Sequence, residues 1–140
     1  MSKKKERVCT RPSCSNTNVD RHNKGGYCCH YCWHQHKYEK NLEDWFSGKI
    51  SGHINCKNLK LKEFVRRYIF EKYGECCSLC GFEGYNQKTG NTIIQIDHID
   101  GDKENSRPEN LRTLCPNCHA MTPTFMALNK GNGRKFRYSE

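Results

Sequence analysis

The chain has 140 residues, 34% of them hydrophobic, which suffices for one ordinary domain or two small ones but not for a large core. Its 24 Lys and Arg outnumber its 15 Asp and Glu, and the resulting net charge of +9 favours a nucleic-acid partner. No apolar run approaches the roughly 20 residues that cross a membrane, and none follows the basic start as in a signal peptide. We therefore expect a cytoplasmic protein with no membrane partner, in which clustered cysteines among the 11 bind metal.

The first cysteine group lies near the N-terminus and predicts a small metal-binding module. Its preferred ligand set is Cys9, Cys14, Cys29 and Cys32, a spacing similar to that of zinc ribbons and zinc fingers. Cys28 competes with Cys29 for the third position, and the spacing leaves this choice open. A structural Zn²⁺ ion would order a segment that is too polar to order itself. Aromatic and cationic side chains alternate after the group, which suits either contact with bases and phosphates or the packing of a small core.

Periodicity predicts helices in the middle of the chain and strands after them. Helices are expected over 41–47 and 60–73, the second because its apolar residues repeat every 3.6 residues. A β-branched run predicts a strand over 92–96, and a second, short strand is expected over 111–114. A final helix is expected over 115–128, with a proline in its first turn. These elements predict a small α+β fold.

The second cysteine group consists of two CxxC pairs and predicts a structural zinc site. Its ligands are Cys77, Cys80, Cys115 and Cys118. Two such pairs can place four thiolates tetrahedrally around Zn²⁺, and sites of this kind are usually closed and structural. Cys76 is an alternative to Cys77, but the CxxC spacing favours Cys77. Because metal binding contributes folding free energy, the site would stabilise a fold that has little apolar core.

Acidic and imidazole side chains gather between the two CxxC pairs. The expected strand delivers Asp97 and His98 to its C-terminal end, and the second CxxC pair opens the helix that carries His119. Asp97 and His119 are therefore expected to reach one divalent cation, with His98 beside it. Such a set suits phosphodiester cleavage, because an imidazole can deprotonate a water while a hard cation neutralises the phosphate. Asp100 and Asp102 flank a glycine and indicate an ordinary turn.

The spacing of four residues in this region resembles the motif of a known nuclease family. Asn110 follows His98 by twelve positions and His119 follows it by twenty-one, and with Asp97 and the framing CxxC pairs this resembles the HNH endonucleases. The resemblance covers about residues 57–135 and implies a ββα-metal fold that hydrolyses DNA. It implies that His98 is the general base and that Asn110 holds the His98 loop in position. It also implies that Asp97 and His119 bind the catalytic ion, which is Mg²⁺ or Mn²⁺, with Ni²⁺ or Zn²⁺ as alternatives.

The cysteine groups and the resemblance together predict three segments. Residues 1–48 are expected to form the N-terminal zinc-binding module that contacts DNA, and residues 49–75 a helical linker. Residues 76–135 are expected to form the HNH nuclease module. Positive charge is concentrated at the N-terminal end, where residues 1–40 contain nine Lys and Arg against three acids.

The function expected from these features is that of a metal-dependent HNH DNA endonuclease. Its biological role would be of the homing, restriction or packaging type, in a bacterial or phage-infected host cell. The alternative is a non-catalytic, zinc-dependent nucleic-acid-binding protein, which would need none of the four motif residues. RNA remains open as a substrate. Because one active site cuts one strand per encounter, double-strand cleavage would need a dimer or two successive events.

Overall fold

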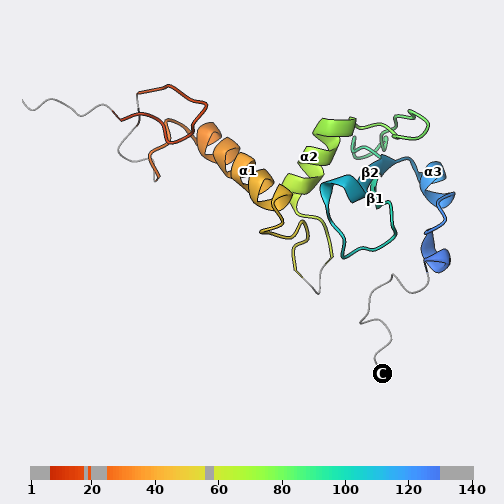
Figure 1. The fold of residues 1–140 in the computed structure, drawn as a ribbon. Helices are drawn as coiled ribbons and strands as arrows, with labels where there is room; N and C mark the ends of the chain where they lie inside the picture. Colours follow the sequence, from red (N-terminus) through yellow and green to blue (C-terminus); the bar gives the residue numbers. More distant parts are fainter. Residues whose placement is uncertain (1–6, 18, 20–24, 56–58, 130–140) are drawn as a thin grey trace, which may run out of the picture. The chain divides into compact units, whose positions relative to one another are not determined.

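The computed structural model describes residues 7–17, 19, 25–55 and 59–129 (Figure 1). By their contacts, the residues divide into two compact units, Met1–Asp44 and Trp45–Glu140. The elements in chain order are α1 (His30–Phe46), α2 (Glu63–Tyr73), β1 (Gln95–His98), the 3₁₀ helix η1 (Pro108–Asn110), β2 (Leu111–Leu114), α3 (Pro116–Ala120) and the 3₁₀ helix η2 (Met126–Leu128). Helices and a small sheet make an α+β fold, as the sequence predicted.

The first unit contains most of α1, which is much longer than the helix expected over 41–47. The apolar pattern did not reveal its first turns because few apolar residues lie there. Polar and sulfur contacts fix these turns instead. Cys32 and Tyr38 are buried, and the Arg11 guanidinium forms an ion pair with Glu39 at 2.9 Å. These contacts join the start of α1 to the segment around Arg11.

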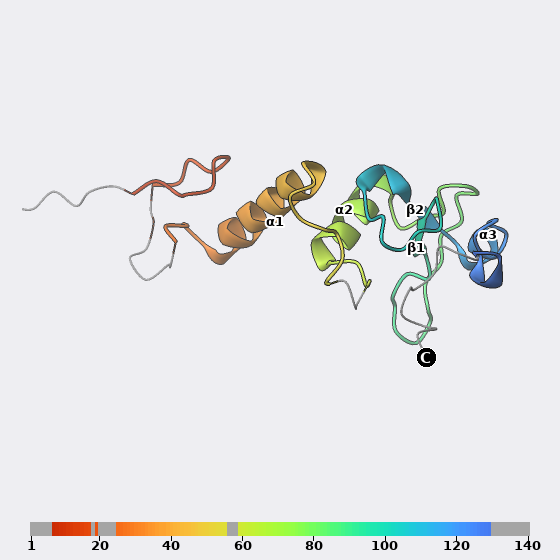
Figure 2. The ribbon, with the colours of Figure 1, turned by 60° about the horizontal axis from the view of Figure 1, so that its bottom comes forward.

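The second unit is built on the antiparallel pair of β1 and β2, which lie side by side (Figure 2). Asp97 of β1 is the cross-strand partner of Arg112 of β2, and His98 ends β1. α2 packs on β2 and buries Val65 and Ile69 completely. α3 follows β2 directly, so the order of these elements is that of the expected ββα arrangement.

Two elements differ from their expected bounds. The strand expected over 92–96 begins only at Gln95. Its partner, Leu114, is the last residue of β2, because the following residue, Cys115, caps α3. Residues before Gln95 therefore have no partner in β2. The helix expected over 115–128 ends at residue 120, and only the short η2 follows. Pro123 explains this break, since proline has no N–H group to donate and disfavours helical geometry at the residue before it.

A polar junction holds the chain before α2 against the loop after β1. The indole Nε1 of Trp45 donates to the Ser106 carbonyl oxygen at 2.8 Å, and the Gly52 N–H donates to the Ser106 hydroxyl at 3.0 Å. A β-carbon at Gly52 would lie 2.8 Å from that hydroxyl oxygen, so the approach requires glycine. The next residue, His53, forms a β-bridge with Leu61. The junction therefore places His53 in the interior of the unit, where it is only 4% exposed.

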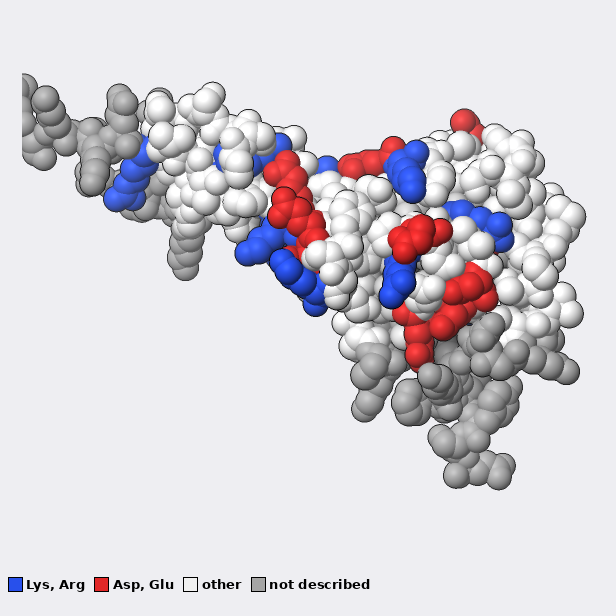
Figure 3. Space-filling model, viewed as in Figure 1, with Lys and Arg blue, Asp and Glu red and all other residues white. Residues whose placement is uncertain are grey.

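The charged surface is mixed. On the face shown in Figure 3, acidic side chains gather in one patch of the Trp45–Glu140 unit, whereas Lys and Arg side chains are dispersed. The net charge of +9 is therefore not gathered in one basic patch on this face of the described residues. No helix in the described part of the chain has the length and apolar character needed to cross a membrane.

Candidate functional site

The Asp97 carboxylate lies near the end of β1, and the side chain of Arg112 holds one of its two oxygens. Its Oδ2 atom accepts a hydrogen bond from Nε of Arg112 at 3.0 Å and forms an ion pair with Nη2 of the same residue, also at 3.0 Å. Because the two residues are cross-strand partners, the pairing of β1 with β2 fixes this contact. The other oxygen, Oδ1, lies 3.6 Å from Nε2 of His119 on α3. The fold thus brings Asp97 and His119 together, with the carboxylate oriented by Arg112.

Asp97 and His119 fit a shared divalent cation. Two ligands that bind an ion at about 2.1 Å and at right angles lie about 3 Å apart, and wider angles separate them further. The 3.6 Å between Oδ1 and Nε2 lies within this range. Among the residues that the structure describes, no third histidine, cysteine or acid completes a group with these two. Asp100 and Asp102 therefore do not join this pair, in keeping with the turn that the sequence indicates.

The His98 imidazole, at the end of β1, is half-buried and belongs to the residue that follows Asp97. Its Nε2 atom is buried and has no hydrogen-bond partner among the described residues. Burial lowers the pKa of His98, and the nearby His53 lowers it further. The imidazole is therefore neutral at neutral pH and able to accept a proton.

Asn110 ties together the loop that follows His98. Its Nδ2 donates to Oδ1 of Asp100 and to the Asn105 carbonyl oxygen, both at 2.8 Å. Its Oδ1 accepts from the Asp100 N–H at 3.1 Å, and its carbonyl oxygen accepts from the Ile99 N–H at 2.9 Å. Burial raises the pKa of Asp100, but hydrogen bonds from Asn105 and Asn110 outweigh it and lower the pKa. Asp100, which the sequence presents only as a turn residue, is thus the main partner of Asn110.

The second cysteine group forms a compact tetrad at the edge of the core, in which three members are buried and Cys80 is exposed. Its members are Cys77, Cys80, Cys115 and Cys118, and their sulfur atoms all lie within 4.8 Å of one another. The Cys80 and Cys115 sulfurs are 3.8 Å apart, which matches the edge of about 3.8 Å in a thiolate tetrahedron with metal–sulfur bonds of about 2.3 Å. Neighbouring thiols at Cys80 and Cys115 raise the pKa of Cys118 to about 12. A bound cation would displace such protons, so the tetrad fits a metal ion.

The N-terminal cysteine group differs from the expected set in one member. The structure groups Cys9, Cys14, Cys28 and Cys32, with Cys28 in the place for which the sequence prefers Cys29. Cys28 precedes α1 and Cys32 lies in its first turn; their sulfurs are 3.4 Å apart, and the Cys28 sulfur also lies 3.7 Å from that of Cys14. Cys29 is exposed. The start of α1 thus turns Cys28 inward and Cys29 outward, which spacing alone does not reveal.

Sequence reasoning missed His53, which lies beside His98. The two ring centroids are 5.9 Å apart, and the ring planes are inclined by 25°. His53 precedes residues 57–135, the part of the chain that resembles the HNH motif, and its contact with His98 depends on the junction at Gly52. No signal in the local sequence indicates this contact.

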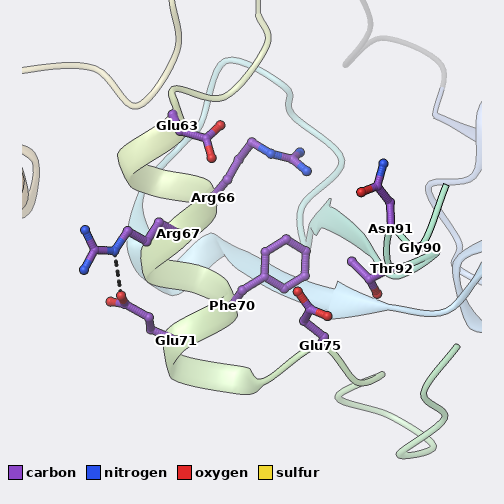
Figure 4. A pocket seen from close by; sticks show the side chains of 9 residues that line it. All are labelled: Glu63, Arg66, Arg67, Phe70, Glu71, Glu75, Gly90, Asn91 and Thr92. Atoms are coloured by element: carbon purple, nitrogen blue, oxygen red, sulfur yellow. Dashed lines mark hydrogen bonds and ion pairs between the residues drawn. The ribbon is translucent and has the colours of Figure 1, made fainter. Parts of the chain in front are cut away.

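A shallow groove lies elsewhere in this unit, between α2 and the segment 90–92 (Figure 4). Charged side chains of both signs line it, including Arg67 and Glu71, which pair with each other at 2.7 Å. None of its lining residues is one of the four motif residues or a cysteine of either group. The groove is therefore separate from the candidate site.

Comparison with known proteins agrees with this geometry. Residues 87–121 match a family model described as HNH endonuclease. The chain is 32% identical over 107 residues to the H-N-H endonuclease F-TflIV of Escherichia phage T5, an alignment that covers 76% of this chain and 41% of the relative. The chain thus spans less than half the length of this relative. No solved structure matches the chain significantly.

The matched stretch contains all four motif residues, Asp97, His98, Asn110 and His119. It also contains the second CxxC pair, whereas the first pair precedes it. The resemblance predicted from the sequence is therefore confirmed: residues 87–121 match the HNH endonuclease family model, and the chain is similar to a phage H-N-H endonuclease.

Proposed function

We propose that the chain is a metal-dependent endonuclease that hydrolyses phosphodiester bonds in DNA. The observation that carries this proposal is the meeting of Asp97 and His119, 3.6 Å apart, next to the neutral imidazole of His98. This combination provides a cation site and a general base within one small region. The HNH match over residues 87–121 and the name of the phage T5 relative support the same reaction class.

In the proposed reaction, the residues of the chain have distinct roles. His98 takes a proton from the attacking water, and because its Nε2 is buried, Nδ1 is the nitrogen available for this step. Asp97 and His119 would hold Mg²⁺ or Mn²⁺, and the ion, when bound, supplies positive charge for the phosphate and the leaving oxygen. Arg112 orients the Asp97 carboxylate. Asn110 keeps the loop after His98 in place through its hydrogen bonds.

Cleavage is expected to persist at lower pH than with an ordinary histidine base. Burial and the neighbouring His53 lower the pKa of His98 below the usual 6.5. A general base acts in its neutral form, which predominates above its pKa, so a lower pKa moves the loss of activity to more acidic pH. Single-turnover rates measured from acidic to neutral pH should show a midpoint below 6.5. A midpoint above this value would contradict the role of buried His98 as the base.

Zinc is proposed as the ion in both cysteine groups. Each group offers four sulfur ligands within 4.8 Å of one another, and tetrahedral thiolate sites favour Zn²⁺. Both ions would be structural, because four protein ligands leave no open coordination position. In the first unit, such an ion would join the loop around Cys9 and Cys14 to the start of α1.

The two adjacent cysteines at the start of α1 are expected to respond differently to substitution. Cys28→Ser should remove zinc from the N-terminal group, because Cys28 contacts Cys14 and Cys32. Cys29→Ser should retain it, because Cys29 is exposed and outside the group. Zinc per chain, measured by elemental analysis of the purified variants, checks this. Loss of zinc in Cys29→Ser with retention in Cys28→Ser would contradict the assignment.

The first unit is proposed to assist DNA binding. Tyr31 and Trp33 are exposed on α1, and each lies near a cation. The Arg11 guanidinium is 5.7 Å from the Tyr31 ring centroid, and the Lys37 ammonium is 5.3 Å from that of Trp33. Exposed rings next to cations suit stacking on bases and contact with phosphates. This surface supports the DNA-contacting role proposed for residues 1–48.

The remaining segments and the biological role complete the proposal. The nuclease module would cover 76–135, and the linker 49–75 would support it, since α2 packs on β2. The likeness to a phage T5 protein supports a phage or mobile-element origin, with action in the cytoplasm of the bacterial host. One site per chain would nick one strand at a time, and double-strand cleavage would take a dimer or two encounters.

Labelled oligonucleotide duplexes of DNA and of RNA, incubated with Mg²⁺ or Mn²⁺ or with a chelator, test this function. We expect metal-dependent cleavage of DNA that leaves ligatable ends and little cleavage of RNA. Cleavage of RNA alone would contradict DNA as the substrate. If no metal supports cleavage but the protein still binds DNA with a steep dependence on salt, the non-catalytic zinc-dependent binding protein would replace the nuclease.

A further inference from the structure

A second histidine lies beside the proposed general base and has no role in the reaction described above. His53 is 4% exposed, and its ring lies nearly parallel to that of His98, with the centroids 5.9 Å apart. It lies outside the matched stretch 87–121 and outside both cysteine groups. Its burial next to His98 therefore calls for a separate explanation.

Both imidazoles contain a buried nitrogen without a partner. The Nε2 atoms of His53 and His98 are buried and have no hydrogen-bond partner among residues in the described ranges. Buried polar atoms in proteins are nearly always hydrogen-bonded. A neutral imidazole donates through one nitrogen and accepts through the other, so two neighbouring rings can satisfy each other.

The distance between the rings allows such a bond after a small movement. An imidazole nitrogen lies about 1.1 Å from its ring centroid, so nitrogens that face each other across 5.9 Å would be roughly 3.7 Å apart, a few tenths of an ångström beyond hydrogen-bond length. The rings are stacked, and an imidazole N–H lies in the plane of its own ring, so both side chains would have to turn for one nitrogen to point at the other. The backbone at His53 is held by the hydrogen bond from Gly52 to Ser106 and by the bridge to Leu61, so the movement would come from the side chains.

We propose that His53 is a positioning residue for His98 and that its Nε2 accepts a hydrogen bond from Nε2–H of His98. This bond places the His98 proton on Nε2 and leaves the lone pair of Nδ1 free to take a proton from the attacking water. It also restricts rotation of the His98 ring. The proposal rests on the proposed role of His98 as the general base.

A direct test is nuclear magnetic resonance of the full chain, uniformly labelled with ¹⁵N and loaded with zinc and Mg²⁺. The bond predicts a ¹⁵N–¹⁵N coupling between Nε2 of His98 and Nε2 of His53, together with slow exchange of the His98 Nε2–H proton. Both signals should vanish in His53→Phe, which keeps an aromatic ring but has no acceptor. A His98 proton on Nδ1 in the wild type would overturn the proposal.

Cleavage kinetics test the consequence of the bond. His53→Phe is expected to lower the single-turnover rate by about 10-fold to 100-fold, the usual effect of losing an orienting partner, with little change in DNA affinity. His53→Gln, whose amide oxygen can accept the bond, is expected to recover much of the rate. Equal rates in the wild type and His53→Phe would overturn the proposal, as would a loss in His53→Gln as large as that in His53→Phe.

Two controls separate this proposal from a packing role of His53 and from failure of the proposed nuclease function. Zinc content and melting temperature of the variants show whether the fold is intact, and a purely packing role would be rescued by Phe rather than by Gln. If the wild type cleaves no DNA, the proposed nuclease function fails. The ¹⁵N–¹⁵N coupling would still decide on the bond between His53 and His98, because it does not depend on catalysis.

Discussion

His98→Ala is expected to lower the single-turnover rate of DNA cleavage by about 10³-fold, within the range that general bases contribute. His98 offers a neutral imidazole beside the pair of Asp97 and His119, and alanine has no group that can accept the proton of the attacking water. DNA affinity and zinc content should stay unchanged, because His98 belongs to neither cysteine group. A quenched time course on a labelled duplex, with enzyme in excess, gives the rate.

His34→Ala provides the matched control for the loss of an imidazole. His34 lies on α1, is exposed, and is outside the matched stretch 87–121. Because His34 lies next to Trp33 on the proposed DNA-contacting surface, this variant is expected to weaken DNA binding but, with saturating enzyme, to cleave at the wild-type rate. A His98→Ala protein that cleaves as fast as His34→Ala would remove His98 from the mechanism.

Cys118→Ser is expected to unfold the Trp45–Glu140 unit. Cys118 belongs to the second cysteine tetrad and also packs in the buried cluster with Ile94 and Leu114. Structural zinc contributes an apparent 10–16 kcal/mol, roughly, in zinc-finger peptides at neutral pH, which equals or exceeds the roughly 5–15 kcal/mol that stabilises a domain. The free energy lost with the ion would therefore exceed the free energy of unfolding of a unit with so small a core. Circular dichroism should show no cooperative melting of this unit.

Cys76→Ser is the control for this variant. Cys76 is adjacent to Cys77 but lies outside the tetrad, and its sulfur donates to the Tyr73 carbonyl oxygen at 3.1 Å. A serine hydroxyl can make the same bond, so zinc content and melting temperature should match the wild type. If both variants kept full zinc and melted alike, the tetrad would not be the structural centre of the unit.

The sequence predicts best the features that depend on local chemistry. The α2 helix lies within the range expected over 60–73, and β2 occupies 111–114 as expected. The CxxC pairs and the Asp97–His98 pair are short patterns whose residue types and spacing indicate the chemistry directly. A small metal-stabilised α+β fold with an HNH motif is therefore predictable from the amino-acid sequence alone.

Features that depend on distant contacts were not predictable. Cys28 rather than Cys29 joins the N-terminal tetrad because the start of α1 sets the direction of each side chain. His53 meets His98 because Gly52 fits against Ser106, a contact between segments far apart in the sequence. No periodicity or spacing in the sequence indicates the position of Cys28 in the tetrad or the contact between His53 and His98.

Manganese binding tests most directly whether Asp97 and His119 hold the ion that works beside His98. Electron paramagnetic resonance of the zinc-loaded chain, titrated with Mn²⁺ in the presence of DNA, should show one tightly bound Mn²⁺ per chain. The same site should persist in His98→Ala, which lacks only the base, and should disappear in Asp97→Asn and His119→Ala. Wild-type binding in Asp97→Asn, or no bound Mn²⁺ in the wild type, would contradict the proposed one-ion site.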